Sequence, residues 1–283
     1  MNLSDFSFNI FLDTVYLLRS SERLSAKIRI LGTYARLNIK SILLCKAFRV
    51  RLRKEKFLNF RVSFFNYDTF YLMFREIFLR HEYSFKSEKK NPVILDCGSN
   101  IGMATLFFKF CYPKSEIFCF EPDKNAFSLL KKNIEHNRLL NVHTDNVALS
   151  NREGFIDLYI DDESSGSLLM STEPARLHNN KIAVRSALLS SYIKEPVDFM
   201  KMDIEGSEEV VIEELHNKGK LRLIKEMVIE YHHFNYTGKK RSKLSNLLKI
   251  LEDNGFNYQI SSLLIRISRR HKFQDILIYA YQE

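Results

Sequence analysis

The stretch that most constrains this chain is residues 93–102. Val93–Cys97 is almost wholly apolar, as expected for a strand buried on both faces of a parallel sheet. Gly98 and Gly102 then predict a tight turn, and residues 103–110 predict a helix directly after it. Because a glycine turn lets a ligand approach the backbone and a helix N-terminus offers unpaired N–H groups, this unit indicates a site for a nucleotide-like cofactor.

The spacing within the turn separates two classes of cofactor. A dinucleotide site needs the pattern G-x-G-x-x-G, but Asn100 and Met103 stand where its second and third glycines belong. The pattern D-x-G-x-N-x-G, from Asp96 to Gly102, instead resembles motif I of S-adenosylmethionine-dependent methyltransferases. That resemblance implies that Asp96 faces the amino-acid portion of the cofactor and that Gly98 and Gly102 admit its body. Taken alone, the motif would also fit an ordinary strand–turn–helix whose glycines serve only the turn.

Length and charge predict one large domain preceded by a basic extension. The chain has 283 residues and a net charge of +9. Residues 1–90 hold 18 Lys/Arg and 8 Asp/Glu, whereas the remaining residues hold 25 and 26. We therefore expect residues 1–59 to form a basic, mainly helical extension, and residues 60–283 to form the domain that binds the cofactor.

Two interpretations of the extension stay open. Ten basic residues and one acid, Glu55, lie from Lys27 to Lys56, with apolar residues near helical spacing. They predict either a helix with a solvated basic face or a surface that meets anionic lipid head groups or an acidic substrate. No apolar run reaches the roughly 20 residues that span a bilayer, no signal peptide is evident, and the four cysteines lack metal-binding spacing. We expect a cytoplasmic protein, with residues 27–56 as the candidate for peripheral membrane contact.

From residue 60 onward, predicted strands alternate with predicted helices. This order indicates an α/β fold with a mostly parallel sheet and right-handed crossovers. The last two strands have no helix between them, which predicts a terminal antiparallel hairpin. The expected sheet strands are 93–97, 116–121, 141–148, 197–203, 223–231, 256–260 and 276–281, with 60–65 and 154–160 outside it. The expected helices are one capped by Asp68 and ending near residue 80, then 103–110, 123–137, 206–217 and 242–253.

Two further strand ends carry polar residues suited to a cofactor. Glu121 and Pro122 follow about 20 residues after the glycine turn, where an acid accepts hydrogen bonds from ribose hydroxyls in such folds. Asn146 follows the next strand, where an adenine ring is expected. The alternatives are a surface glutamate and an asparagine that only makes a turn.

The densest group of ionisable residues follows the fourth sheet strand. Period-two alternation places Lys201, Asp203 and Glu205 on one strand face. Such groups at the mouth of a sheet are costly unless they pair with one another or with a ligand. His232, beside Glu230 at the end of the next strand, is a candidate general base. A purely structural lysine–carboxylate network is the alternative.

Six segments together form a family pattern: FREIFLRHEYSF, ILDCGSNIG, FEPD, NVALS, DFMKMDIEGSE and IEYHH. They resemble the FkbM family of S-adenosylmethionine-dependent O-methyltransferases over about residues 60–260. The most family-specific element is K-x-D-x-E-G-x-E, from Lys201 to Glu208. The chain has Ser99 where the family usually has alanine, and the extension has no counterpart in the family core. The resemblance implies a Rossmann-like class I methyltransferase fold with a seven-stranded sheet.

The resemblance also implies S-adenosylmethionine as cofactor and a hydroxyl-bearing acceptor, such as a glycan or glycolipid. An alcohol must lose its proton as it accepts a methyl group, so a base near the methyl is required. Asp203 and His232 are the two candidates, and their order stays open. The expected catalytic residues are Asp203, His232, Lys201 and Glu205, and the expected cofactor-binding residues are Asp96, Gly98, Asn100, Gly102, Glu121, Pro122, Asn146 and Asp203. No metal ligand is expected.

Two rival functions are a nucleic-acid methyltransferase and a non-catalytic, membrane-associated protein that binds S-adenosylmethionine. The first would explain the basic extension, but methylation of base amino groups usually uses an Asp/Asn-Pro-Pro-aromatic element after the fourth strand. This chain has Asp203-Ile204-Glu205-Gly206 there, and no RNA-binding module appears. Nucleic acid is therefore the less favoured partner.

Overall fold

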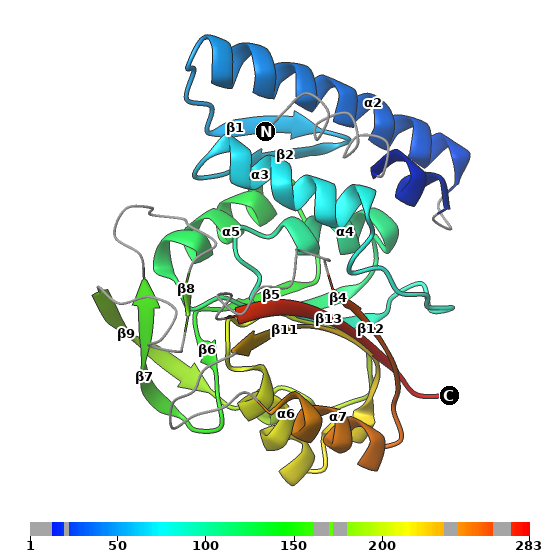
Figure 1. Ribbon diagram of the computed structural model, residues 1–283, viewed down its shortest axis with the longest axis vertical. Helices are drawn as coiled ribbons and strands as arrows, with labels where there is room; N and C mark the ends of the chain where they lie inside the picture. Colours follow the sequence, from blue (N-terminus) through cyan, green and yellow to red (C-terminus); the bar gives the residue numbers. More distant parts are fainter. Residues whose placement is uncertain (1–12, 20–22, 161–169, 172–179, 235–242, 263–272) are drawn as a thin grey trace.

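The computed structural model describes residues 13–19, 23–160, 170–171, 180–234, 243–262 and 273–283. Its centre is a seven-stranded sheet in which β13 runs in the opposite direction to the other six strands (Figure 1). This confirms the Rossmann-like α/β fold and the terminal hairpin that the sequence predicts. The strands, in spatial order, are β12 (Asn257–Ser262), β13 (Phe273–Tyr281), β11 (Ile224–Phe234), β10 (Val197–Met202), β3 (Val93–Cys97), β4 (Glu116–Phe120) and β5 (Val142–Asp145).

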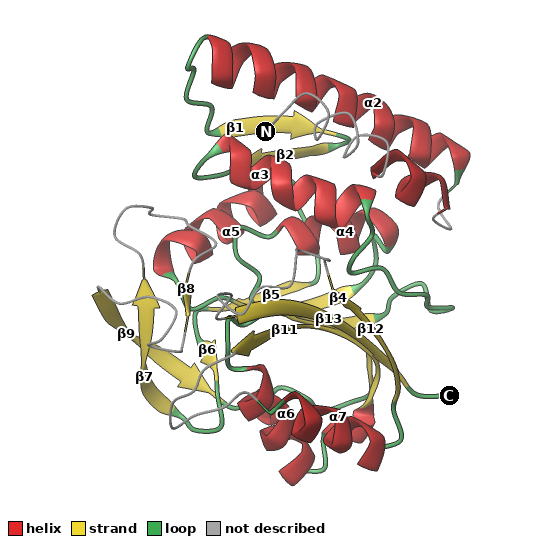
Figure 2. Ribbon diagram, in the orientation of Figure 1, coloured by secondary structure: helices red, strands yellow, loops and turns green. Residues whose placement is uncertain are grey.

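Helices cover both faces of this sheet. Helices α4 (Met103–Cys111) and α5 (Lys124–His136) lie on one face, and α6 (Glu208–Asn217) and α7 (Leu244–Asp253) lie on the other (Figure 2). Successive residues of β3 and β10 serve opposite faces: Ile94 and Phe199 join one hydrophobic cluster, whereas Leu95 and Met200 join the other. Because both faces are covered, β3 and β10 are mostly apolar, and their charged residues are Asp96, Asp198 and Lys201.

A second, smaller sheet begins where the expected third strand breaks. The sequence predicts one strand over 141–148, but β5 ends at Asp145 and the short β6 (Ala148–Leu149) joins a different sheet. There it pairs with β9 (Asn180–Ala187), which also pairs with β7 (Gly154–Ile160), and β7 pairs with β8 (Met170–Ser171). The break leaves residues 146–147 at the carboxyl end of the main sheet.

The N-terminal region is helical only in part. Helix α2 (Leu24–Lys40) continues into the π-helix η1 (Ser41–Ala47), but β1 (Lys54–Phe57) forms an antiparallel hairpin with β2 (Phe60–Ser63). The hairpin crosses the boundary expected after Asn59, and the division of the chain at that residue stays a prediction. Among the described residues, no helix has the length and apolar character needed to cross a membrane.

Helix α3 (Tyr67–Phe74) follows the hairpin and continues as the π-helix η2 (Arg75–Leu79). The cap of α3 is Asn66, whose side chain accepts a hydrogen bond from the Thr69 N–H at 2.7 Å. The predicted cap, Asp68, lies in the first turn instead. An acid there still interacts favourably with the helix dipole, which explains why the sequence signal lies two residues late.

The extension shares a hydrophobic core with the main sheet. Ile30 and Leu37 of α2 belong to the same cluster as Phe57, Phe74 and Ile94, all of them buried. Asn133 of α5 also binds the hairpin, accepting from Ser63 N at 2.7 Å and donating to Ser63 O at 3.0 Å. A fully buried large apolar side chain contributes about 1.5–3 kcal/mol, so removing α2 would cost the fold several such contributions.

Candidate active site

The turn after β3 is held by close backbone packing. A Cβ on Gly98 would lie 1.7 Å from the carbonyl oxygen of Asp203, so only glycine fits there. Gly102 has φ +90°, and a Cβ on it would lie 2.7 Å from Leu130 Cδ1. Asn100 takes the left-handed conformation with φ 48°. Gly98 is therefore required by the Asp203 backbone, which brings the turn against the end of β10, whereas Gly102 is favoured by its positive φ.

Asp96 lies beneath this turn and is fully buried. Its Oδ2 accepts a hydrogen bond from Thr105 Oγ1 at 2.7 Å, and its Oδ1 has no hydrogen-bond partner and lies 3.8 Å from Lys201 Nζ. Burial raises the pKa of this carboxyl group, and the Lys201 ammonium opposes that shift. Asp96 therefore acts on the turn from below, through Thr105 and Lys201.

Glu121 joins the turn to the end of β4. Its Oε2 accepts from the Asn100 N–H at 2.8 Å and its Oε1 accepts from the Asp123 N–H at 2.9 Å. Burial raises the pKa of Glu121 to about 7. Asn146 Nδ2 donates to the carbonyl oxygens of Glu121 at 2.7 Å and Pro122 at 3.0 Å, which fixes this strand end against that of β5. The structure thus brings the predicted cofactor residues 98–102, 121, 122 and 146 to one edge of the sheet.

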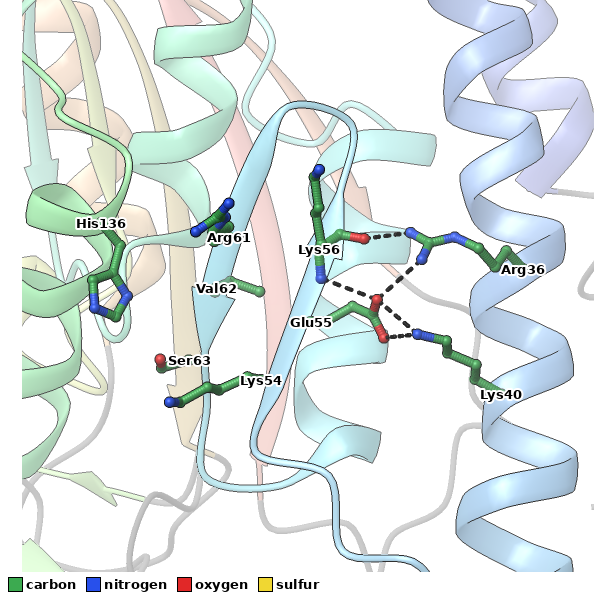
Figure 3. Close-up of a pocket in the computed structure, with 9 residues that line it drawn as sticks. All are labelled: Arg36, Lys40, Lys54, Glu55, Lys56, Arg61, Val62, Ser63 and His136. Atoms are coloured by element: carbon green, nitrogen blue, oxygen red, sulfur yellow. Dashed lines mark hydrogen bonds and ion pairs between the residues drawn. The ribbon is translucent and has the colours of Figure 1, made fainter.

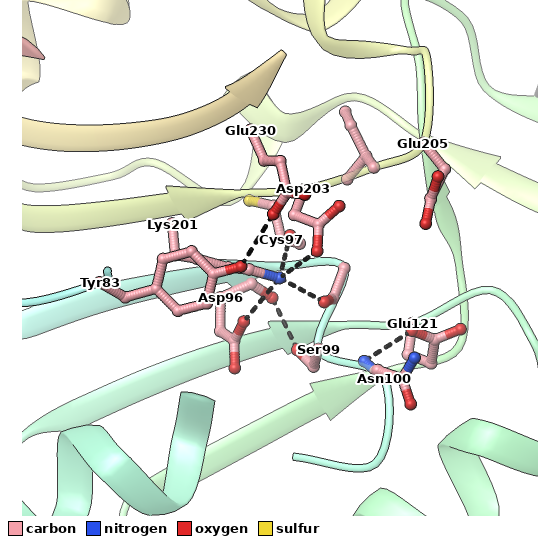
Figure 4. Close-up of polar contacts among 12 residues, drawn as sticks. Tyr83, Asp96, Cys97, Ser99, Asn100, Glu121, Lys201, Asp203, Glu205 and Glu230 are labelled. Atoms are coloured by element: carbon pink, nitrogen blue, oxygen red, sulfur yellow. Dashed lines mark hydrogen bonds and ion pairs between the residues drawn. The ribbon is translucent and has the colours of Figure 1, made fainter. Parts of the chain in front are cut away.

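Lys201 is the centre of the polar network (Figure 4). It is 3% exposed and donates to Gly98 O at 2.6 Å and, more weakly, to Cys97 O at 3.3 Å. Its Nζ also lies 3.5 Å from Asp203 Oδ2. Burial alone would lower the pKa of Lys201, but the carboxylates of Asp203 and Asp96 outweigh it and raise the pKa. Lys201 therefore stays protonated and links the turn to Asp203, and it is unsuited to accept a proton.

Tyr83 is a member of the site that the sequence does not reveal. Its ring centroid lies 5.4 Å from Lys201 Nζ, and its hydroxyl donates to Glu230 Oε2 at 3.1 Å (Figure 4). Two effects raise the pKa of Glu230 to about 8: the charge of the nearby Asp203, which is the larger, and burial. Tyr83 comes from the segment after η2, and only the family pattern FREIFLRHEYSF hinted that this segment matters.

His232 is held among three carboxylates. Its Nδ1 lies 2.9 Å from Glu208 Oε1, and its Nε2 lies 3.3 Å from Glu205 Oε2 and 3.9 Å from Asp203 Oδ1. Burial would lower the pKa of His232, but the Glu208 carboxylate outweighs it and raises the pKa to about 9. The imidazole is therefore charged at neutral pH, and both ring nitrogens already face acceptors. Glu208 keeps the imidazole protonated, a role that its position as the last residue of the K-x-D-x-E-G-x-E motif does not reveal.

Three of these side chains also suit a cation. Within the part of the chain that the structure describes, the ligand atoms of Asp203, Glu205 and His232 lie within 4.8 Å of one another. Two carboxylate oxygens and one imidazole nitrogen are donors that divalent metals accept. With His232 protonated, its imidazole has no lone pair for a metal ion, and the group then offers only its two carboxylates.

Exposure divides the site into a buried frame and two accessible acids. The side chains of Lys201 and His232 are 3% and 4% exposed, whereas those of Asp203 and Glu205 are 26% and 23% exposed. All four lie at the carboxyl ends of β10 and β11, beside the glycine turn. Ligands of parallel sheets bind at this edge. The arrangement presents a carboxylate that can take a proton, held in place by buried cations.

Comparison with known proteins agrees with this geometry. The Methyltransferase FkbM domain matches residues 96–258, which includes the turn, the Lys201 network and both strand ends. Methyltransferase sdnD of Sordaria araneosa is 26% identical over 217 residues, which cover 65% of this chain and 81% of that protein. The 2-O-methyltransferase NoeI of Sinorhizobium fredii is 31% identical over 142 residues, which cover 44% of this chain and 58% of that protein.

Among solved structures, the methyltransferase FkbM from Methylobacillus flagellatus KT aligns with a TM-score of 0.45 and 15% identity, covering 89% of this chain and 62% of that one. The family domain covers more than half of the present chain and contains the whole of the polar network around Lys201 except Tyr83. The chain belongs to the FkbM methyltransferase family.

Proposed function

We propose that this methyltransferase uses S-adenosylmethionine to methylate a hydroxyl group of a sugar or glycolipid. The observation that carries the proposal is the partly exposed Asp203 carboxylate, fixed by Lys201 beside the glycine turn. A hydroxyl acceptor needs a base at this position, because its proton must leave as the new bond forms. When bound, S-adenosylmethionine supplies a methyl group already activated on a sulfonium.

The residues at the turn fit such a cofactor. The left-handed turn 98–102 brings backbone to the sheet edge without side chains at Gly98 and Gly102. Glu121 is tied to that turn by the Asn100 N–H, and each carboxylate oxygen keeps a lone pair that can accept from a ribose hydroxyl. We assign residues 98–102, Glu121, Pro122 and Asn146 to holding the cofactor.

Asp203 is the base in this proposal, in preference to His232. Both nitrogens of His232 face carboxylates, and its raised pKa keeps it protonated at neutral pH. The Asp203 charge and burial raise the pKa of Glu230 to about 8, so Glu230 also holds its proton at neutral pH and is unsuited to be the base. His232 and Lys201 then position the Asp203 carboxylate and stabilise its charge, and Glu205 offers a second accessible carboxylate to the acceptor.

The choice of an oxygen acceptor follows from the relative NoeI, whose name specifies a 2-O-methyltransferase. The choice of a sugar or glycolipid rests on the family resemblance. A nucleic-acid acceptor is disfavoured because the segment Asp203-Ile204-Glu205-Gly206 forms a charged turn, in which Glu205 and Gly206 both have positive φ, in place of an aromatic base-stacking element.

The test separates binding from transfer. Calorimetry with S-adenosylhomocysteine measures cofactor binding. Extracts that lack this protein are then incubated with labelled S-adenosylmethionine, with and without the purified protein, to identify the fraction that holds the acceptor. We expect binding, with label in glycan or glycolipid. Label in nucleic acid would support the rival enzyme, and saturable binding without transfer to any fraction would support a non-catalytic protein. Absence of binding would refute the cofactor.

A further inference from the structure

The exposed large apolar side chains of the described residues gather in the N-terminal region. Thirteen such side chains are exposed, and nine of them lie between residues 16 and 50, so their distribution is far from random. Scattered single apolar residues are normal on a surface, but a contiguous group marks an interaction site. The nine are Tyr16, Leu18, Leu24, Ile28, Ile39, Ile42, Leu43, Phe48 and Val50.

Helix α2 and its continuation η1 carry five of these nine side chains, three of them on α2. Leu24, Ile28 and Ile39 are 71%, 61% and 57% exposed, and they share a helix face with the exposed Gly32 and Ala35 between them. The opposite face, with Ile30 and Leu37, is buried against the rest of the protein. We call the exposed face the outer stripe and define it as Leu24, Ile28, Gly32, Ala35, Ile39, Ile42 and Leu43. Figure 1 shows α2 at the outer edge of the molecule, away from the main sheet.

A row of basic side chains borders the outer stripe. Arg29, Arg36 and Lys40, at helical positions i, i+7 and i+11, reach from α2 to the β1–β2 hairpin. Arg29 donates to Asn59 Oδ1 at 2.8 Å, Arg36 donates to Lys56 O, and Lys40 donates to both carboxylate oxygens of Glu55 at 2.9 Å. Residues 23–54 contain ten Lys/Arg and no Asp/Glu. The stripe is thus embedded in positive charge.

A pocket of about 540 Å³ opens beside this row (Figure 3). Its single acid, Glu55, is buried and already neutralised by Arg36 at 3.1 Å and Lys40 at 2.9 Å. Five Lys/Arg line the pocket, so the wall has an excess of positive charge over this one carboxylate. Such a wall selects an anion, and the volume admits a phosphate-bearing head group. The lining residues are Arg36, Lys40, Lys54, Glu55, Lys56, Arg61, Val62, Ser63 and His136.

We propose that the outer stripe and the basic pocket dock this protein on the surface of an anionic phospholipid bilayer. An interfacial helix needs an apolar face that enters the bilayer boundary and basic residues that meet head-group phosphates, and α2 has both side by side. The pocket receives one head group next to the stripe. The surface acts independently of the reaction chemistry, and it goes beyond the proposed function by placing the enzyme at a membrane.

Charge distinguishes this occupant from a second copy of the chain. Two copies joined through their outer stripes would bring two acid-free basic regions together, and like charges oppose such contact. An anionic bilayer removes that repulsion and covers the apolar side chains at once. Basic residues near an anionic bilayer each contribute about fivefold to binding, an effect that falls off over roughly a Debye length, near 10 Å at 0.1 M salt.

Flotation of the full-length protein with vesicles tests the proposal. Vesicles of neutral phosphatidylcholine are compared with vesicles that also contain phosphatidylglycerol, at low and high salt. We expect binding to the anionic vesicles only, with at least tenfold weakening at high salt. Failure to bind anionic vesicles at low salt would overturn the proposal.

Variants of exposed residues locate the surface. Ile28→Ser with Ile39→Ser should weaken vesicle binding at least tenfold, and Lys54→Gln with Arg61→Gln should weaken it to a similar extent. Matched controls on other surfaces, Phe155→Ser and the pair Lys194→Gln with Lys218→Gln, should bind vesicles like the unaltered protein. Thermal melting checks that all variants fold.

Two other results would assign the surface differently and overturn the proposal. A dimer in light scattering that Ile28→Ser with Ile39→Ser dissociates, without vesicle binding, would make a second copy the occupant. Calorimetric binding of free inorganic phosphate or a soluble inositol phosphate that Lys54→Gln with Arg61→Gln removes, while vesicles are not bound, would make the pocket a site for a soluble anion.

Discussion

The two charged regions of this protein use the same residue types in opposite ways. At the ends of β10 and β11, Lys201 and His232 are buried and surrounded by carboxylates, and their pKa values are raised as a result. Around the β1–β2 hairpin, lysines and arginines outnumber a single acid and face solvent. Buried cations paired with carboxylates hold reacting groups in fixed positions. Exposed charges in excess attract a partner at long range, and salt screens them.

The largest effect is expected at Asp203, the partly exposed acid of the polar network around Lys201 and His232. Asp203→Asn should lower the rate of methyl transfer by about 10²- to 10⁴-fold, the range over which a positioned base contributes. Binding of S-adenosylhomocysteine should change little, because Lys201 still binds Gly98 O. Single-turnover kinetics and calorimetry measure the two effects. Full activity in the Asp203→Asn variant would remove Asp203 from the role of base.

Two lysines provide the sharpest contrast in stability. Lys201→Met should lower the free energy of unfolding by about 3–5 kcal/mol, because it leaves the buried Asp96 carboxyl group without its cation. Lys54→Met, in the wall of the basic pocket, should change it by no more than about 0.5 kcal/mol. Urea denaturation measures both variants. Equal losses would contradict the division into a buried frame and a solvated surface.

The pH dependence of stability should reveal the charge on His232. The pKa of His232 is raised from 6.5 to about 9 in the folded protein, so its stabilising contribution is fully present below pH 6.5 and is lost as pH rises through 9. The stability difference between the unaltered protein and His232→Gln should therefore shrink between about pH 6.5 and 9.5, by the order of 1–3 kcal/mol.

The pKa itself is measured by NMR titration of the imidazole. Glu208→Gln removes the carboxylate that raises it, and should lower the pKa of His232. A histidine that titrates near its ordinary value of 6.5 in the unaltered protein would contradict the assignment.

The smallest effect is expected from metal removal. Because protonated His232 has no lone pair to give a metal ion, treatment with EDTA should leave methyl transfer within about twofold of its untreated rate. Assays with and without added Mg²⁺ or Mn²⁺ provide the comparison. Loss of activity that either ion restores would make these three residues a working metal site.

The sequence predicted the elements whose pattern is local. Apolar runs indicated the sheet strands, and the spacing from Asp96 to Gly102 located the turn. The roles of single residues depended on contacts across the sheet that no spacing encodes. Gly98 is required by Asp203, more than one hundred residues later, and Tyr83 meets Lys201 and Glu230 only in the folded chain. Helix α2 has apolar residues on two faces, so its periodicity could not show which face is buried.

The contact between Gly98 and Asp203 has a consequence for how strongly the two substrates bind. The turn assigned to the cofactor and the strand end assigned to the acceptor touch through their backbones, and Lys201 bonds to the turn while it faces the Asp203 carboxylate. Any displacement of the turn must therefore shift Asp203. We expect thermodynamic coupling between the two substrates, so that each changes the affinity for the other by the same factor.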